Sequence, residues 1–91
     1  MKLERAVELV NTYGLHARPA SHLVALTNRF VAEIRVRKGQ EEVDGKSVLH
    51  LMTLAAAKGT ELVITAEGPD AEEALDAIVT MVAEGFGEDI P

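Results

Sequence analysis

The sequence predicts an α+β domain, an open-faced β-sandwich in which three helices cover one face of a four-stranded antiparallel sheet in the order βαββαβα. Three observations lead to this prediction. Segments with a two-residue apolar period alternate with segments of helical period. A short turn, Lys38-Gly39-Gln40, joins two of the strand-like segments. Each helical segment has one apolar stripe, and a two-layer arrangement is the economical way to bury three such stripes.

The first strand and the first helix differ in the period of their apolar residues. Residues 3–10 alternate weakly, with Val7 and Leu9 on one side, which predicts a strand. A helix is expected over residues 17–29, because Pro19 is favoured in a first helical turn, where its missing N–H removes no hydrogen bond. Apolar residues then follow at helical spacing: Leu23, Leu26 and Phe30, with Ala20, Val24 and Thr27 beside them.

The middle of the chain predicts a hairpin and a short helix. Residues 33–37 alternate cleanly, and residues 41–44 return after the turn as a short strand. Ser47 is a favourable N-cap for the apolar run that begins at Val48, and Lys58-Gly59 ends that run. This pattern predicts one short helix or two helical turns.

The last third of the chain predicts a strand and then a helix. Residues 61–67 form the strand, and Gly68-Pro69 ends it. Asp70 is expected to cap the helix that follows, with Glu73 completing a capping box. The strand places three apolar residues on one face: Leu62, Ile64 and Ala66.

The final helix has the longest apolar stripe in the sequence. It ends at Gly85, and residues 86–91 are expected to form a loose tail. Residues 1–91 make up a single domain, because this length supports one hydrophobic core. The stripe consists of Ala71, Ala74, Leu75, Ile78, Val79 and Val82.

The composition excludes several classes of protein. Nine basic and fifteen acidic residues give a net charge of −6 with few aromatic residues, whereas nucleic-acid binding needs clustered Lys and Arg with stacking rings. The absence of cysteine excludes disulfides and thiolate chemistry. No segment has the apolar length of a membrane span, and residues 1–5 do not resemble a signal peptide. We therefore expect a cytoplasmic protein that binds neither nucleic acid nor membrane. We also expect it to be a monomer.

The segment Gly14-Leu15-His16-Ala17-Arg18-Pro19-Ala20 places a histidine where a loop becomes a helix. The free N–H groups of the first helical turn, including that of Ala17, and the guanidinium of Arg18 form a small anion site beside His16. A helix N-terminus disfavours the imidazolium form, which keeps a ring lone pair available for a phosphoryl group. No carboxylate lies within a few residues of His16, which suits an incoming dianion. The alternative is an ordinary cap or surface histidine.

This segment resembles the active-site signature of the HPr family, the phosphocarriers of the phosphoenolpyruvate-dependent phosphotransferase system. Gly45-Lys46-Ser47-Val48-Leu49 resembles the second signature of the family, and Ala57-Lys58-Gly59-Thr60 resembles the segment after it. The resemblance implies a four-stranded antiparallel sheet with three helices, and a carrier with no turnover or cofactor of its own. It also implies that His16 accepts a phosphoryl group on Nδ1 from phosphorylated enzyme I and passes it to an EIIA-type acceptor, with Arg18 binding the phosphate.

Ser47 has two interpretations. As an N-cap it needs no further role. The resemblance implies a regulatory site for a dedicated kinase (HPr kinase/phosphorylase), whose product would bring negative charge next to a docking surface. Val48 and Leu49 cannot both face the core, so we expect one of them to be exposed in a docking patch, with Lys46 nearby.

The other two histidines are expected to be surface residues. His22 lies six positions after His16 and is interpreted as a surface residue rather than a second ligand. His50 is interpreted as a solvated helix residue, with an influence on Ser47 or on the choice of partner as the alternative. No spacing of His, Asp or Glu suggests a metal site.

Two alternative functions remain open. The first is a nitrogen-type regulatory phosphocarrier, because Asn11 and residues 84–89 resemble those relatives. The second is a binding module that regulates a partner by docking, switched at Ser47, with His16 incidental. The intact His16-Ala17-Arg18 argues against this second alternative.

Overall fold

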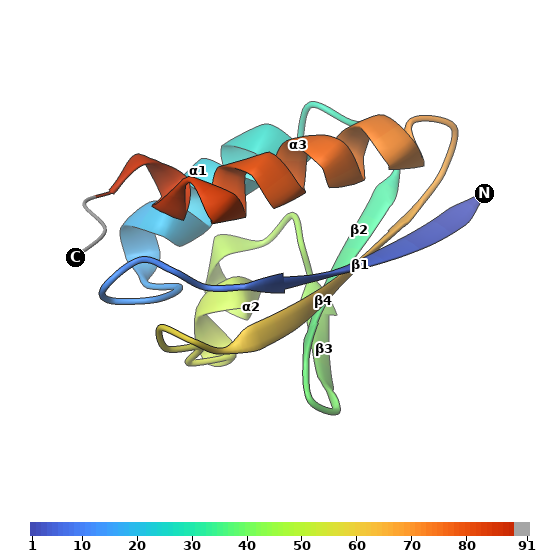
Figure 1. Ribbon diagram of the computed structural model, residues 1–91. Coiled ribbons are helices and arrows are strands. Elements are labelled where there is room, and N and C mark those ends of the chain that lie inside the picture. Colours follow the sequence, from blue (N-terminus) through green and yellow to red (C-terminus); the bar gives the residue numbers. More distant parts are fainter. Residues whose placement is uncertain (89–91) are drawn as a thin grey trace.

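The computed structural model describes residues 1–88 and confirms the predicted order βαββαβα (Figure 1). The elements are β1 (Lys2–Glu8), α1 (Ala17–Thr27), β2 (Glu33–Lys38), β3 (Glu41–Asp44), α2 (Val48–Thr53), β4 (Glu61–Glu67), α3 (Ala71–Ala83) and a 3₁₀ turn (Gly85–Gly87). The four strands form one antiparallel sheet. None of the helices within residues 1–88 has the length and apolar character needed to cross a membrane.

The strand that comes last in the sequence lies inside the sheet. The order in space is β1-β4-β2-β3, so β4 is hydrogen-bonded to β1 on one side and to β2 on the other. In this register Val7 lies opposite Leu62, and Ile34 lies opposite Ala66. Each of these residues is at most 8% exposed. The pairing therefore places the apolar residues of three strands on the same face of the sheet.

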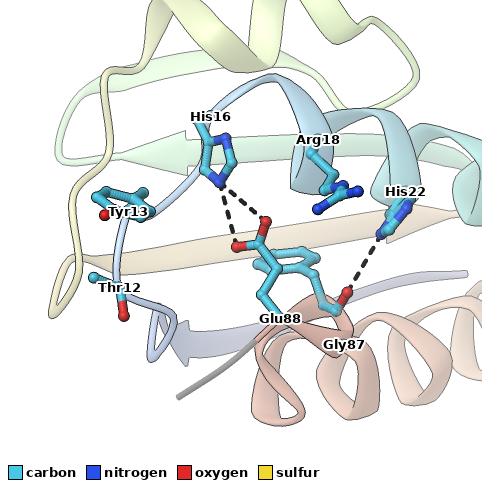
Figure 2. A pocket seen from close by; sticks show the side chains of 8 residues that line it. Thr12, Tyr13, His16, Arg18, His22, Gly87 and Glu88 are labelled. Carbon is cyan, nitrogen blue, oxygen red and sulfur yellow. Dashed lines mark hydrogen bonds and ion pairs between the residues drawn. The ribbon is translucent and has the colours of Figure 1, made fainter. Parts of the chain in front are cut away.

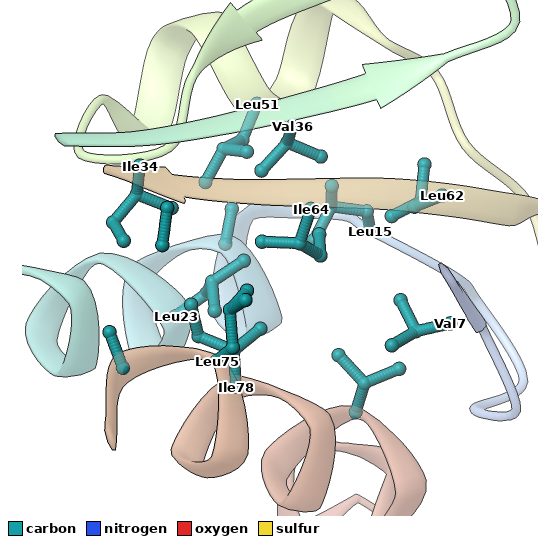
Figure 3. Packing of buried hydrophobic residues seen from close by; sticks show 14 of the residues in the cluster. Val7, Leu15, Leu23, Ile34, Val36, Leu51, Leu62, Ile64, Leu75 and Ile78 are labelled. Atoms are coloured by element: carbon teal, nitrogen blue, oxygen red, sulfur yellow. The ribbon is translucent and has the colours of Figure 1, made fainter. Parts of the chain in front are cut away.

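The core lies between that face and the helices (Figure 3). α1 and α3 lie side by side over the sheet, and α2 packs against α1 (Figure 1). The predicted α3 stripe is confirmed as buried, with Val79 partly exposed. Leu51 of α2 is also fully buried in the same cluster. The opposite face of the sheet carries polar residues such as Glu33 and Arg35, so the sandwich is open on that side.

The loop between β1 and α1 is tied to the segment before β4. The Leu15 N–H donates to the Ala56 carbonyl oxygen over 2.9 Å, and the Leu9 N–H donates to the Thr60 carbonyl oxygen over 3.0 Å. Gly14 has φ +64°, and a β-carbon there would collide with the carbonyl oxygen of Ala56. This close approach fixes the backbone immediately before His16.

The expected capping box at the start of α3 is wrong. The side chain of Asp70 makes no cap hydrogen bond with its own helix. Its two carboxylate oxygens instead accept from the N–H groups of Val31 and Ala32, each over 2.8 Å. The chain entering β2 brings these two donors to the start of α3, and two hydrogen bonds from another segment replace the local cap.

The expected loose tail is wrong for residues 86–88. Phe86 is 4% exposed and belongs to the core cluster, although its φ is +58°. The N–H groups of Gly87 and Glu88 donate to the carbonyl oxygens of Glu84 and Gly85. Burial of one aromatic ring thus holds this segment against the helices. Residues 89–91 lie outside the described residues.

Candidate phosphoryl site

His16 is the N-cap of α1 and has an extended backbone, with φ −90° and ψ −171°. Its side chain is 40% exposed. The first hydrogen bond of the helix runs from the Ala20 N–H to the His16 carbonyl oxygen. Within residues 1–88 the N–H groups of Ala17 and Arg18 donate no hydrogen bond, and Pro19 has none to donate. The ring therefore lies beside two unpaired donors at the positive end of a helix dipole.

Arg18 and Tyr13 line the same pocket as His16 (Figure 2). Arg18 is exposed, and its guanidinium makes no hydrogen bond or ion pair within residues 1–88. This leaves its donors available to an anion at the site. The ring of Tyr13 is 79% exposed and meets the His16 ring edge to face, with centroids 6.0 Å apart and planes at 88°.

His22 is exposed, as expected, but it also lines this pocket. Six residues of helix place His22 on a different side of the axis from His16. His22 nevertheless lines the pocket, because the pocket extends along α1 past Arg18 (Figure 2). Arg18 lies one helical turn before His22. Its Nδ1 lies 3.3 Å from the carbonyl oxygen of Phe86. That oxygen can only accept, so the His22 Nδ1 donates.

A carboxylate lies directly against His16, contrary to the expectation from the neighbouring sequence. The Glu88 Oε2 is 3.1 Å from the His16 Nε2, and its Oε1 is 3.3 Å from the same nitrogen. The Glu88 Oε1 also accepts from the Asn11 Nδ2 over 2.9 Å. Inspection of residues close to His16 could not reveal this contact, because the two residues are separated by 72 positions.

The pKa of Glu88 is lowered by its partners. Desolvation is the largest effect and acts to raise this pKa. The hydrogen bonds from Asn11 and His16, together with the charges of His16 and Arg18, outweigh it. The net shift is downward, so Glu88 is an ionised carboxylate near neutral pH.

Asn11 is a site residue that the sequence analysis did not assign. It is fully buried, and its Nδ2 donates to the Gly14 carbonyl oxygen over 2.7 Å as well as to Glu88. Its Oδ1 accepts no hydrogen bond within residues 1–88. Asn11 therefore connects the turn before His16 to the side-chain carboxylate of Glu88. Its only local signal is its position three residues before Gly14, where an amide can bond to the turn.

The second predicted cluster surrounds the start of α2. Ser47 is the N-cap, and its hydroxyl accepts from the His50 N–H over 3.2 Å. Leu49 is 76% exposed and Val48 is partly buried, which confirms that only one of the two is fully exposed. Met52 is also exposed, one helical turn after Leu49. The Lys46 ammonium donates to the Phe30 carbonyl oxygen over 2.7 Å, so it is already engaged within the protein.

No group of three or more His, Asp or Glu side chains in residues 1–88 has the geometry to hold a metal ion. Besides the Glu88 carboxylate on Nε2, the polar groups gathered at His16 are donors: two backbone N–H groups and a guanidinium. Donors of this kind bind anions such as a phosphoryl group.

Comparison with known proteins agrees with this geometry. Residues 3–84 match the family described as the PTS HPr component phosphorylation site. Phosphocarrier protein HPr of Cupriavidus necator is 37% identical over 86 residues, which cover 94% of this chain and 97% of that protein. Phosphocarrier protein NPr of Escherichia coli K12 is 40% identical over 90 residues, which cover 98% of this chain and 100% of that protein.

The fold comparison gives the same answer. The crystal structure of HPr-C-His from Thermoanaerobacter tengcongensis matches with a TM-score of 0.93 at 38% identity, covering 97% of this chain and 99% of that chain. The protein therefore belongs to the HPr family, the phosphocarriers of the phosphotransferase system, which work with enzyme I and EIIA-type partners.

Proposed function

We propose that this protein carries a phosphoryl group on Nδ1 of His16, received from phosphorylated enzyme I and passed to an EIIA-type acceptor in the cytoplasm. The observation that supports the proposal most directly is the half-exposed imidazole beside two unpaired N–H groups and an unengaged arginine. The N–H groups of Ala17 and Arg18, with the Arg18 guanidinium, would bind the phosphoryl oxygens. A shallow, open site of this kind suits exchange with a second protein.

The transfer needs only one nucleophile. A lone pair of the His16 ring attacks phosphorus as the bond between phosphorus and the donor protein breaks, and that electron pair returns to the donor. Onward transfer reverses these roles, because the bond between His16 and phosphorus breaks when the acceptor attacks. Neither step requires water or a cofactor.

Labelling with phosphoenolpyruvate tests the proposal. The purified chain is mixed with enzyme I and labelled phosphoenolpyruvate, and acid-labile label is measured. We expect about one label per chain, which disappears in His16→Ala and is retained in His22→Ala and His50→Ala. The two control variants remove the other histidines of the chain, of which there are three in all. Label that persists in His16→Ala, or no label with any enzyme I tried, rejects the proposal.

The branch of the phosphotransferase system is a separate question. The chain is similar to an HPr at 37% identity and to an NPr at 40%, so identity does not separate the sugar-type from the nitrogen-type branch. Initial rates with enzyme I of each type would separate them. We expect the cognate enzyme I to phosphorylate His16 at least about tenfold faster than the other, which is a difference of about 1.4 kcal/mol in transition-state binding.

A regulatory role for Ser47 is the second proposal, and the exposure of Leu49 supports it. Phosphorylation would place about −2 charge beside an exposed leucine at the start of α2. This would weaken docking of an apolar or acidic partner surface. Ser47→Asp keeps an N-cap acceptor and adds charge, so we expect slower transfer from enzyme I at an unchanged melting temperature. Equal rates for Ser47→Asp and wild type argue against the switch.

A further inference from the structure

Glu88 connects the segment of residues 85–88 to the His16 ring (Figure 2). Its carboxylate contacts the His16 Nε2 through both oxygens, at 3.1 Å and 3.3 Å, and accepts a hydrogen bond from Asn11. The Glu88 side chain is 16% exposed, so it is enclosed more than the imidazole it contacts. The contact between Glu88 and His16 is therefore largely shielded from solvent on the Glu88 side.

Three further contacts hold Glu88 in place. The Glu88 N–H donates to the Gly85 carbonyl oxygen over 2.9 Å. The ring of Phe86 is buried in the core, and its carbonyl oxygen accepts from the His22 Nδ1. Both ends of this short segment are thus bonded to α1 or to the loop before it. These contacts hold the backbone of Glu88 beside the site, and the hydrogen bond from Asn11 holds its carboxylate, so the side chain can orient the neighbouring ring.

The ionised state of Glu88 determines which nitrogen of the His16 ring carries the proton. An ionised carboxylate has no proton to donate and can only accept. A glutamate with an ordinary pKa is already ionised near neutral pH, and the partners of Glu88 lower its pKa further. The His16 Nε2 must therefore be the N–H donor in this contact, and in the neutral ring the lone pair is then on Nδ1.

We propose that Glu88 is a positioning residue for His16: it holds the proton on Nε2, so that Nδ1 is the nucleophile, and it balances the positive charge that the ring gains on phosphorylation. This inference rests on the proposed function of His16 and adds a second residue to it. The carboxylate of a serine protease triad holds its histidine in the correct tautomer through the same kind of contact.

The proton and the electrons balance in this scheme. The Nδ1 lone pair forms the new bond to phosphorus, the Nε2 proton stays in place, and the ring becomes a cation facing the Glu88 carboxylate. When the acceptor attacks phosphorus, the bond breaks and its electron pair returns to Nδ1, which leaves a neutral ring with the same Nε2 proton. No separate acid or base is needed at either step.

The tautomer can be measured without any partner protein. In a ¹⁵N-resolved spectrum of the whole chain at alkaline pH, where the rings are neutral, we expect His16 to be almost entirely the Nε2–H form. Glu88→Ala should give a mixture of the two tautomers. Glu88→Gln should restore much of the Nε2–H form, because its side-chain oxygen still accepts. His50, which is exposed on α2, gives the reference in the same spectrum. A tautomer ratio that is the same in Glu88→Ala and wild type overturns the proposal.

Transfer rates test the functional half of the proposal. We expect Glu88→Ala to slow phosphorylation of His16 by about tenfold, and Glu88→Gln to remain slow because it lacks the charge. Glu84→Ala removes an exposed carboxylate four residues before Glu88 and should react like wild type. A Glu88→Ala rate within about twofold of wild type, or a faster rate, overturns the proposal. If wild type is not labelled at all, the proposed function fails, while the tautomer measurement still decides the role of Glu88.

Discussion

Gly14 shows how one backbone position controls where His16 lies. Its φ is +64°, and its α-carbon lies against the carbonyl oxygen of Ala56 with no room for a β-carbon. The next residue, Leu15, is buried and bonded to the same carbonyl oxygen. The loop can therefore deliver His16 to the start of α1 only if residue 14 has no side chain.

Gly14→Ala should destabilise the fold more than Gly39→Ala. Both residues have positive φ, +64° and +60°, so both variants bear the left-handed penalty of about 1–2 kcal/mol. Only Gly14 adds a collision with backbone, since nothing lies within 4 Å of a β-carbon at Gly39. We expect a further loss of at least about 2 kcal/mol for Gly14→Ala by urea unfolding. Equal losses in the two variants would show that the approach to Ala56 does not matter.

Arg18→Ala should separate function from stability. The side chain is exposed and makes no hydrogen bond within residues 1–88, so its removal should change the free energy of unfolding by less than about 0.5 kcal/mol. Loss of a charged donor to the phosphoryl oxygens should slow transfer from enzyme I by about 10²-fold. Arg18→Lys should recover part of the rate, because it keeps the charge and loses the paired donors. A large drop in melting temperature would make Arg18 a structural residue.

At the scale of elements, Asp70 joins the start of α3 to the start of β2. The hydrogen bond from the Val31 N–H lowers the pKa of Asp70, and desolvation opposes it. The N–H groups of Ala32 and of Asp70 itself, with the charge of Lys46, lower the pKa further. A helix start and a strand start that are far apart in sequence are thus connected by one carboxylate.

This connection should make stability depend on pH. The folded pKa of Asp70 is below its ordinary value of 3.8, so its contribution is complete above the unfolded pKa and is lost as pH falls through the folded value. We expect the free energy of unfolding to fall as the pH drops below about 5 in wild type, and to fall less in Asp70→Asn. Asp76→Asn, on the exposed side of α3, should keep the wild-type slope. An unchanged slope in Asp70→Asn would contradict this account.

At the scale of the whole molecule, the open sandwich separates buried apolar residues from exposed ones. Buried apolar residues lie between the sheet and the helices, and the exposed Leu49 and Met52 lie on α2. Leu75 is fully buried in the core, whereas Leu49 is 76% exposed. The same residue type therefore serves packing at one position and is available for docking at the other.

Two leucine truncations test this division. Leu75→Ala should cost about 2–5 kcal/mol, because it leaves a cavity in the core. Leu49→Ala should change the free energy of unfolding by less than about 0.5 kcal/mol and should raise the concentration of enzyme I needed for half-maximal transfer. Thermal unfolding and the concentration dependence of labelling measure the two effects. A strongly destabilised Leu49→Ala, or one with unchanged transfer, would show that α2 is not the docking surface.

The secondary structure and the position of His16 followed from local patterns. The strand over residues 61–67 and the start of the helix at Ala17 were predicted correctly, because apolar periodicity, proline and N-cap residues act within a few residues of themselves. The order of elements and their one-sided apolar faces then led to the open sandwich. By itself, the sequence determined which elements form and which histidine begins a helix.

The partners of particular side chains were decided only by the tertiary structure. Asp70 bonds Val31 and Ala32 instead of its own helix, and Glu88 bonds His16 across 72 residues. Asp70, predicted to cap its own helix, and Glu88, predicted to lie in a loose tail, thus both form contacts with distant segments. The physical reason is that such contacts depend on how strands and helices pack. Apolar stripes predict which faces of the elements pack together. They do not predict which individual polar side chains then come into contact.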